Sequence, residues 1–284
     1  MVALRSTLVV ALSLALTGGL AAGCGVDVQG AVDPVASAAT KTQSAGAARL
    51  TFVVTFDSAG KAFTLTGDGV VGSGQADLSL NLAAFLSRMG APAGTDPEAR
   101  EIFLEEDGDY VGYLRLGLLG PLPGGVHWMR IDFSKIGKKA GVDVAKLLGT
   151  GMTQDPAQIL SSLRATSGEV VTVGRATIDG ARTIHYRVSV DLAKAAKLRG
   201  VSGDGVATLL AAGAPATVPE DVWVGRDGLV RRLRLAYSLD PNGVPMRTTM
   251  TIGLSGYGDP QNTVVAPPSE DVYDATDLFR KLLR

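Results

Sequence analysis

Short segments in which apolar and polar residues alternate recur along most of this chain. In residues 49–57, for example, Leu50, Phe52, Val54 and Phe56 alternate mainly with polar residues. A period of two places these side-chain types on opposite faces of a β-strand. Such segments are therefore expected to form a sheet with one apolar and one solvated face.

Turn sequences between these segments favour antiparallel pairing. Residues 106–109 (Glu-Asp-Gly-Asp) and 225–228 (Gly-Arg-Asp-Gly) each separate two apolar strands, as hairpin turns do. Roughly ten strands in one antiparallel sheet are predicted. Helices are fewer, and start and stop signals place them at 144–148, 155–163, 192–198, 206–210 and 274–283.

The first two dozen residues have the features of an export signal. Arg5 precedes an apolar run at 8–16, and small residues then lead to Gly23 and Cys24. The run is shorter than the ~20 apolar residues that a stable membrane span needs. Residues 1–23 are therefore expected to be a signal peptide, removed before the protein matures.

Gly23-Cys24 resembles a lipobox, in which the cysteine becomes the mature N-terminus and carries a thioether-linked diacylglyceryl group. Ala21 stands where the usual pattern has Leu, so ordinary cleavage that leaves Cys24 free or removes it is the alternative. Two acyl chains are enough for stable anchoring. Lipidation of Cys24 would hold the protein outside the cytoplasmic membrane.

Composition divides the rest of the chain and excludes several function classes. Residues 24–47 are rich in Ala, Gly, Ser and Thr, which is typical of a flexible tether, and 48–284 are expected to form a single domain. One cysteine excludes an internal disulfide and a multi-thiolate metal site. With 27 Lys+Arg against 28 Asp+Glu, no large basic field is available, so no nucleic-acid partner is expected.

Two segments resemble motifs of cofactor-binding or catalytic sites, but neither meets the requirements of its motif. Residues 67–72 match G-x-G-x-x-G, but an alternating strand follows where a dinucleotide site needs a helix. Residues 253–257 miss the last Gly of G-x-S-x-G. We therefore predict no catalytic residue, no cofactor and no metal site.

The histidine and arginine residues on predicted strands are interpreted as ordinary strand residues without a catalytic or metal-binding role. His127 and His185 lack a companion at metal-ligand spacing, so we expect surface or partly buried strand histidines, although a catalytic pair formed in space stays open. Arg231, Arg232 and Arg234 are expected on a solvated strand face. Contact with anionic lipid headgroups is the alternative for this basic cluster.

Several segments in a fixed order resemble the actinobacterial LppX/LprG-type lipoproteins, which are similar in fold to the LolA/LolB carriers. They are 128–132 (WMRID), 155–160 (DPAQIL), 180–186 (GARTIHY) and, most tellingly, 218–232 (VPEDVWVGRDGLVRR). The resemblance covers roughly residues 48–268. It implies an α+β fold: a strongly curved antiparallel half-barrel whose concave face is covered by helices.

The resemblance also implies that the space between sheet and helices holds the acyl chains of a lipid or glycolipid. Such a protein would carry or present its ligand outside the cytoplasmic membrane, and a membrane lipid transporter is an implied partner. The alternative is a non-catalytic envelope lipoprotein with a solid core, acting in protein–protein interaction or structural support. The candidates for lining the cavity are apolar strand residues: Leu50, Phe52, Val54, Phe56, Ile184, Tyr186, Val188, Leu233, Leu235, Ile252 and Leu254.

Only 5% of residues are aromatic, so aliphatic side chains must fill most of the sheet's apolar face. A wide sheet with few large fillers leaves room for a ligand, which favours the cavity.

Overall fold

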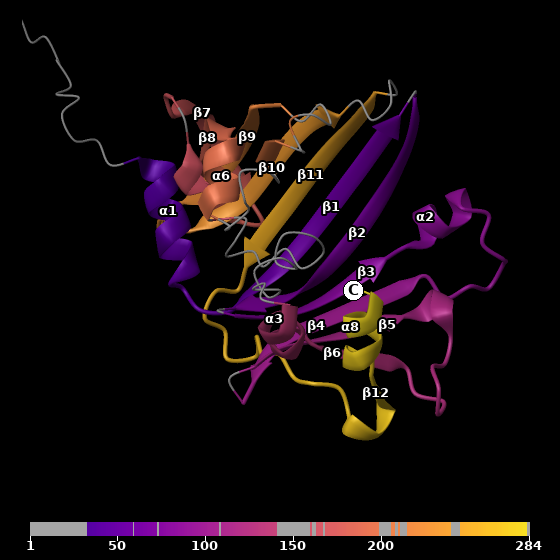
Figure 1. Cartoon of the computed structure of the whole chain (residues 1–284). Coiled ribbons are helices and arrows are strands. Elements are labelled where there is room, and N and C mark those ends of the chain that lie inside the picture. Colours follow the sequence, from indigo (N-terminus) through magenta and orange to yellow (C-terminus); the bar gives the residue numbers. More distant parts are fainter. Residues whose placement is uncertain are drawn as a thin grey trace, which may run out of the picture. The chain divides into compact units, whose positions relative to one another are not determined.

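Twelve strands form one open sheet in the computed structural model of the chain (Figure 1). The structure describes residues 33–58, 60–72, 74–107, 109–140, 160, 163–166, 168–198, 206–207, 210, 215–239 and 245–282. The strands are β1 (Ala48–Ser58), β2 (Lys61–Gly72), β3 (Gln75–Asn81), β4 (Glu98–Glu106), β5 (Asp109–Leu116), β6 (Trp128–Asp132), β7 (Val171–Ile178), β8 (Ala181–Asp191), β9 (Thr217–Gly225), β10 (Val230–Leu239), β11 (Met246–Ser255) and β12 (Val272–Asp274).

The strand order is β12-β6-β5-β4-β3-β2-β1-β11-β10-β9-β8-β7. Neighbouring strands are antiparallel except for the short pair β12–β6, which is parallel. The sheet does not close, because β12 and β7 are its end strands. The predicted class is confirmed: an α+β fold built on one open antiparallel half-barrel sheet.

Register places the apolar residues of successive strands on one face, which we call the inner face. Phe52 of β1 lies opposite Ile252 of β11, and Ile252 lies opposite Leu233 of β10. On the other side, Phe52 lies opposite Gly67 of β2. A Cβ atom at Gly67 would lie 2.3 Å from the ring of Phe52, so this glycine makes room for the aromatic side chain.

Helices cover parts of the inner face. Helix α1 (Pro34–Gln43), helix α6 (Leu192–Leu198) and the turn η2 (Leu163–Ala165) pack over the β8–β10 region, while α3 (Phe133–Ala140) and α8 (Thr276–Leu282) pack over β5 and β6 (Figure 1). The remaining described helical segments are α2 (Ala83–Arg88), η1 (Gly117–Leu119) and η4 (Ser269–Asp271).

The opposite, outer face is not solvated over its whole width. Ile102, Val111 and Tyr113 of β4 and β5 are buried there, against Val264 and Ala266 of the segment that follows β11. The expectation of one fully solvated face is therefore wrong for β4–β6. A return segment without regular structure covers that part of the sheet, which alternation within single strands does not reveal.

Residues 34–43 correct the predicted tether. Asp33 caps α1 by accepting hydrogen bonds from the backbone N–H groups of Val35 (2.8 Å) and Ala36 (3.1 Å), with Pro34 at the first helical position. The helix buries one face against the sheet. Its buried residues are Val35, Ala38, Ala39 and Thr42, at helical spacing. The tether prediction is wrong for this segment; residues 24–32, Cys24 and the signal segment lie outside the described residues.

Of the other elements predicted from the sequence, some are confirmed by the structure and some lie outside the described residues. The helices predicted at 192–198 and 274–283 are confirmed as α6 and α8. The helix predicted at 144–148 lies outside the described residues, as do most of 155–163 and 206–210. Residues 67–72 lie within β2, so the glycine motif sits in a strand.

Within the described part of the chain, none of the helices combines the length and apolar character that crossing a membrane requires.

Candidate functional site

The candidate lining residues share the inner face but differ in exposure. Ile184, two residues from Tyr186 on β8, is 38% exposed. Six are buried: Leu50, Val54, Val188, Leu233, Ile252 and Leu254. Four are half-buried: Phe52, Phe56, Tyr186 and Leu235.

Most of the buried candidates belong to a close-packed core. Leu50, Val188 and Leu233 form one cluster with side chains of α1, α6 and η2, and Phe52 and Tyr186 pack against it. Leu233 is 1% exposed and Val188 is 2% exposed. The inner face under α1 and α6 is therefore filled by protein, as the solid-core alternative requires for that region.

Beyond this core, the inner face carries large apolar side chains that stay half-buried. We call this set the distal apolar surface; it lies at the end of the sheet where β1 ends and β2 begins. Its members lie outside the core clusters of the described residues. They are Phe56, Phe63, Leu65, Leu235 and Tyr237.

Strand register aligns the distal apolar surface with four neighbouring residues, Val54, Met250, Thr248 and Glu220, in two rows across the sheet. The first row runs Leu65, Val54, Met250, Leu235 and Glu220 from β2 to β9. The second row runs Phe63, Phe56, Thr248 and Tyr237 from β2 to β10. The rows join residues distant in sequence into one apolar strip with two polar positions.

Aromatic rings extend the second row toward α2. The rings of Phe56 and Phe63 stack with centroids 4.9 Å apart, and Phe85 of α2 lies 6.4 Å from Phe63. Arg88 lies over the Phe63 ring at 5.5 Å. Phe63, which lies in β2, was not among the lining residues predicted from the sequence.

Glu220 and Thr248 are polar residues buried within this apolar face. Glu220 is 4% exposed and Thr248 is 2% exposed. Neither Oε2 of Glu220 nor Oγ1 of Thr248 has a hydrogen-bond partner among the residues that the structure describes. Burial raises the pKa of Glu220 to about 8. Glu101, on the inner face of β4, also has its pKa raised by burial, to about 7. None of these was among the predicted site residues.

A surface pocket of about 640 Å³ lies at the opposite end, beside the β7–β8 hairpin. Arg175, Arg182 and Arg226 line it together with Ile184 and three small residues. Its cationic lining does not suit an alkyl chain. Ile184 shares the inner face with the other candidates and also borders this pocket, which the others do not line.

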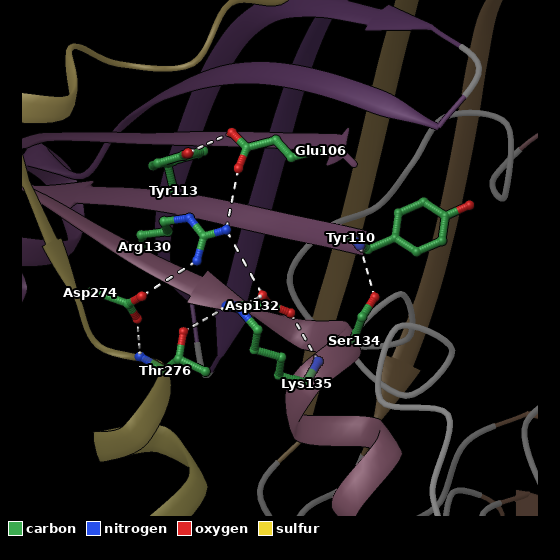
Figure 2. Close-up of polar contacts among 9 residues, drawn as sticks. All are labelled: Glu106, Tyr110, Tyr113, Arg130, Asp132, Ser134, Lys135, Asp274 and Thr276. Atoms are coloured by element: carbon green, nitrogen blue, oxygen red, sulfur yellow. Dashed lines mark hydrogen bonds and ion pairs between the residues drawn. The ribbon is translucent and has the colours of Figure 1, made fainter. Parts of the chain in front are cut away.

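A polar network on β4, β5 and β6 holds the C-terminal segment to the sheet (Figure 2). Arg130 pairs with Glu106 (3.2 Å), with Asp132 (3.8 Å) and with Asp274 (3.4 Å). Tyr113 donates a 2.6 Å hydrogen bond to Glu106. The charged groups of this network are paired with one another, so we assign it a structural role: it fixes the C-terminal segment against the sheet.

The two histidines have separate carboxylate partners. His127 Nδ1 lies 2.8 Å from Asp271, and His185 Nε2 lies 2.8 Å from Asp221 while its ring stacks on Trp223 with centroids 4.2 Å apart. His185 is the partly buried strand histidine that the sequence predicts, whereas His127 lies on the surface just before β6 and not in a strand. They do not form a pair with each other.

Arg232 and Arg234 lie on the outer face, as predicted, but Arg231 does not. An irregularity in register between Val230 and Arg232 turns Arg231 aside, where it pairs with Asp227 and lies over the ring of Tyr257 at 5.1 Å. Among the described residues, no group of three or more His, Cys, Asp or Glu side chains could hold a metal ion.

No protein-family model and no curated protein matches this sequence. Among solved structures, the chain is similar to LprF from Mycobacterium bovis, with 14% identity over 84% of this chain and 95% of that one, and a TM-score of 0.35. It is similar to lipoprotein LppX from Mycobacterium tuberculosis, with 16% identity over 81% and 98% and a TM-score of 0.33. A LolA superfamily protein from Nitrosomonas europaea is similar at 9% identity over 81% and 96%, with a TM-score of 0.25.

Proposed function

We propose that this protein is a non-catalytic lipoprotein of the cell envelope that binds the acyl chains of a lipid or glycolipid on its inner face. In this proposal Cys24 carries the lipid anchor, and the domain carries or presents its ligand outside the cytoplasmic membrane. A membrane lipid transporter is the proposed partner for transfer.

The proposal rests on one observation: part of the inner face is packed into the core, and another part stays half-buried. Leu233 lies in the core, whereas Leu235, two residues along the same strand and on the same face, is half-buried outside it. Half-buried apolar side chains continue with Tyr237 on the same strand, Phe56 on β1 and Phe63 on β2. Contiguous apolar surface of this kind marks a site for a hydrophobic ligand or partner.

An acyl chain fits this strip better than a protein segment for two reasons. The strip runs across strands, along a line of side chains, and it presents no free strand edge for a partner strand to pair with. Its rows are mainly aliphatic and aromatic, with polar groups at Glu220, at Thr248 and on the phenol ring of Tyr237, which suits a long alkyl chain with few polar atoms.

The proposal is tested by a matched pair of tryptophan substitutions in the full chain. Leu235→Trp should reduce binding of an anthroyloxy-labelled stearic acid at least about tenfold while the melting temperature stays close to that of the wild type, because the ring occupies ligand space. Leu233→Trp should lower the melting temperature by several degrees, since overpacking a core costs roughly 1–3 kcal/mol.

The solid-core alternative predicts a different result. If Leu235→Trp lowered the melting temperature as much as Leu233→Trp, and the wild type bound no labelled acid, the strip would be packed by protein and the carrier function would be wrong.

A further inference from the structure

Within the described part of the chain, no residue forms a hydrogen bond with Oε2 of Glu220. Within the sheet it lies opposite Val188 on β8 and opposite Leu235 on β10. Its neighbours on the same face of β9 are Val218 and Val222. Its Oε2 is buried without a hydrogen bond to the described residues, and buried polar atoms in proteins normally have one. Contacts within the fold therefore do not explain why a carboxyl occupies this position.

The position of Glu220 links it to the proposed ligand site. It ends the first row of the distal apolar surface, at the boundary between the core residue Val188 and the half-buried Leu235. An alkyl chain lying along this row would contact apolar side chains from Leu65 to Leu235 and would meet the Glu220 carboxyl at the end of the row.

The protonation state of Glu220 restricts the kind of group that it can bind. Burial raises its pKa to about 8, so near neutral pH the carboxyl is mainly uncharged. An uncharged carboxyl both donates and accepts a hydrogen bond. No basic residue faces Glu220 from its strand or from the neighbouring strands, so the surroundings favour a neutral ligand group.

Thr248 provides a second position of the same kind. Its hydroxyl is buried without a partner in the second row, between Phe56 and Tyr237. Strand spacing places it roughly 12 Å from Glu220, with β10 between them. Two unpartnered buried groups on one apolar strip suggest that the ligand brings polar atoms with it.

We propose that Glu220 is the polar contact of the acyl-binding strip and that it selects lipids carrying a hydroxyl group within or beside their long alkyl chain. A hydroxyl donates one hydrogen bond and accepts another, and so pairs reciprocally with a protonated carboxyl. This inference rests on the proposed function, because it assigns a ligand class to the same surface.

The test compares two acids that differ by one hydroxyl. Stearic acid and 12-hydroxystearic acid would compete with the labelled stearic acid on the full chain. The wild type should bind the hydroxylated acid about five- to tenfold more tightly, the effect of one net hydrogen bond. Glu220→Leu should remove this preference while retaining stearic acid, and Glu220→Gln should keep most of it, because an amide also donates and accepts.

A matched control and a second readout complete the design. Glu98→Leu removes an exposed carboxyl at the start of β4 and should keep the wild-type preference. In the wild type, the infrared C=O band of the protonated carboxyl should shift with 12-hydroxystearic acid and not with stearic acid. This measurement needs no leucine variant to fold.

The outcomes separate the two proposals. If the wild type binds both acids equally, or if Glu220→Leu keeps the full preference, the selection by Glu220 is wrong while acyl binding stands. If neither acid binds, the proposed function fails, and the inference fails with it.

Discussion

The hydroxyl of Thr42 in α1 accepts a 2.9 Å hydrogen bond from the backbone N–H of Val230 in β10 and donates one of 2.7 Å to the carbonyl of Ala38. At the other end of the helix, Asp33 accepts a 2.7 Å bond from Thr166. Residues 33–43 are thereby part of the folded domain. The covalent path from Cys24 to Asp33 spans at most about 30 Å, so a lipid on Cys24 would keep the domain close to the membrane surface.

Thr42→Val should therefore destabilise the protein although it preserves side-chain shape. The substitution leaves the buried N–H of Val230 without an acceptor, which costs roughly 1–3 kcal/mol. Chemical denaturation of the full chain measures the loss. Thr40→Val removes an exposed hydroxyl of the same helix and is the control, with an expected change within about 0.5 kcal/mol. Equal effects of the two substitutions would mean that α1 does not depend on this contact.

The buried carboxyls predict the pH dependence of stability. Glu220 has a folded-state pKa of about 8 and Glu101 one of about 7, both above the ordinary value of 4.5. Between pH 4.5 and 8 the folded state therefore holds more protons than the unfolded state, so the free energy of unfolding falls as pH rises through this interval. For each carboxyl, the slope is at most about 1.4 kcal/mol per pH unit.

Denaturation curves collected from pH 5 to pH 8 measure this slope. Glu220→Gln should flatten the curve by removing one of the two groups, whereas Glu98→Gln, on the surface, should leave it unchanged. A wild-type stability that rises with pH over this range would contradict the assignment of both carboxyls as uncharged in the fold.

Arg130→Met should loosen the C-terminal segment. The guanidinium faces Glu106, Asp132 and Asp274, and its removal leaves these carboxylates close together without their shared partner. We expect a loss of roughly 2–3 kcal/mol and faster hydrogen exchange in α8, which follows Asp274. Arg234→Met, on the exposed outer face, is the control and should behave as the wild type. Unchanged exchange in α8 would show that the network does not hold this segment.

The sheet could be predicted because the sequence patterns that mark its strands and turns involve only neighbouring residues. Alternation marks β1, β8, β10 and β11, and the turn at 225–228 marks the β9–β10 hairpin. The helix α6 was predictable for a similar reason, since Asp191 caps it and accepts a hydrogen bond from the backbone N–H of Lys194. These features depend only on residues a few positions apart.

Features that depend on packing between distant segments were not predictable. Residues 34–43 have a composition typical of a tether, although Asp33 and Pro34 form a local helix-start signal. Their contacts with β10 and Thr166, which join the helix to the domain, cannot be read from local sequence. Likewise, alternation places Leu233 and Leu235 on one face but cannot tell which lies in the core. Glu220 stands in an apolar strand, and only the register shows that both its cross-strand neighbours are apolar.

Cys24→Ala should abolish acylation and release the protein from membranes, because the thioether link needs the cysteine sulfur. Metabolic labelling with an alkyne fatty acid, followed by membrane fractionation, measures both effects. Ser13→Ala, within the apolar run of the signal, should retain label. Label on the Cys24→Ala protein would contradict the anchor.

The central claim, that the inner face holds a lipid, is tested most directly by mass spectrometry of organic-solvent extracts of the full chain purified without detergent from its native membranes. A covalently attached anchor stays with the protein and does not enter the extract, and the comparison with Leu235→Trp corrects for membrane lipid that co-purifies with the anchor. We predict a long-chain lipid at near-stoichiometric amount in the wild type and a much smaller amount in Leu235→Trp. An extract with no long-chain lipid, from a wild-type protein that also fails to bind added acyl chains, would contradict the claim.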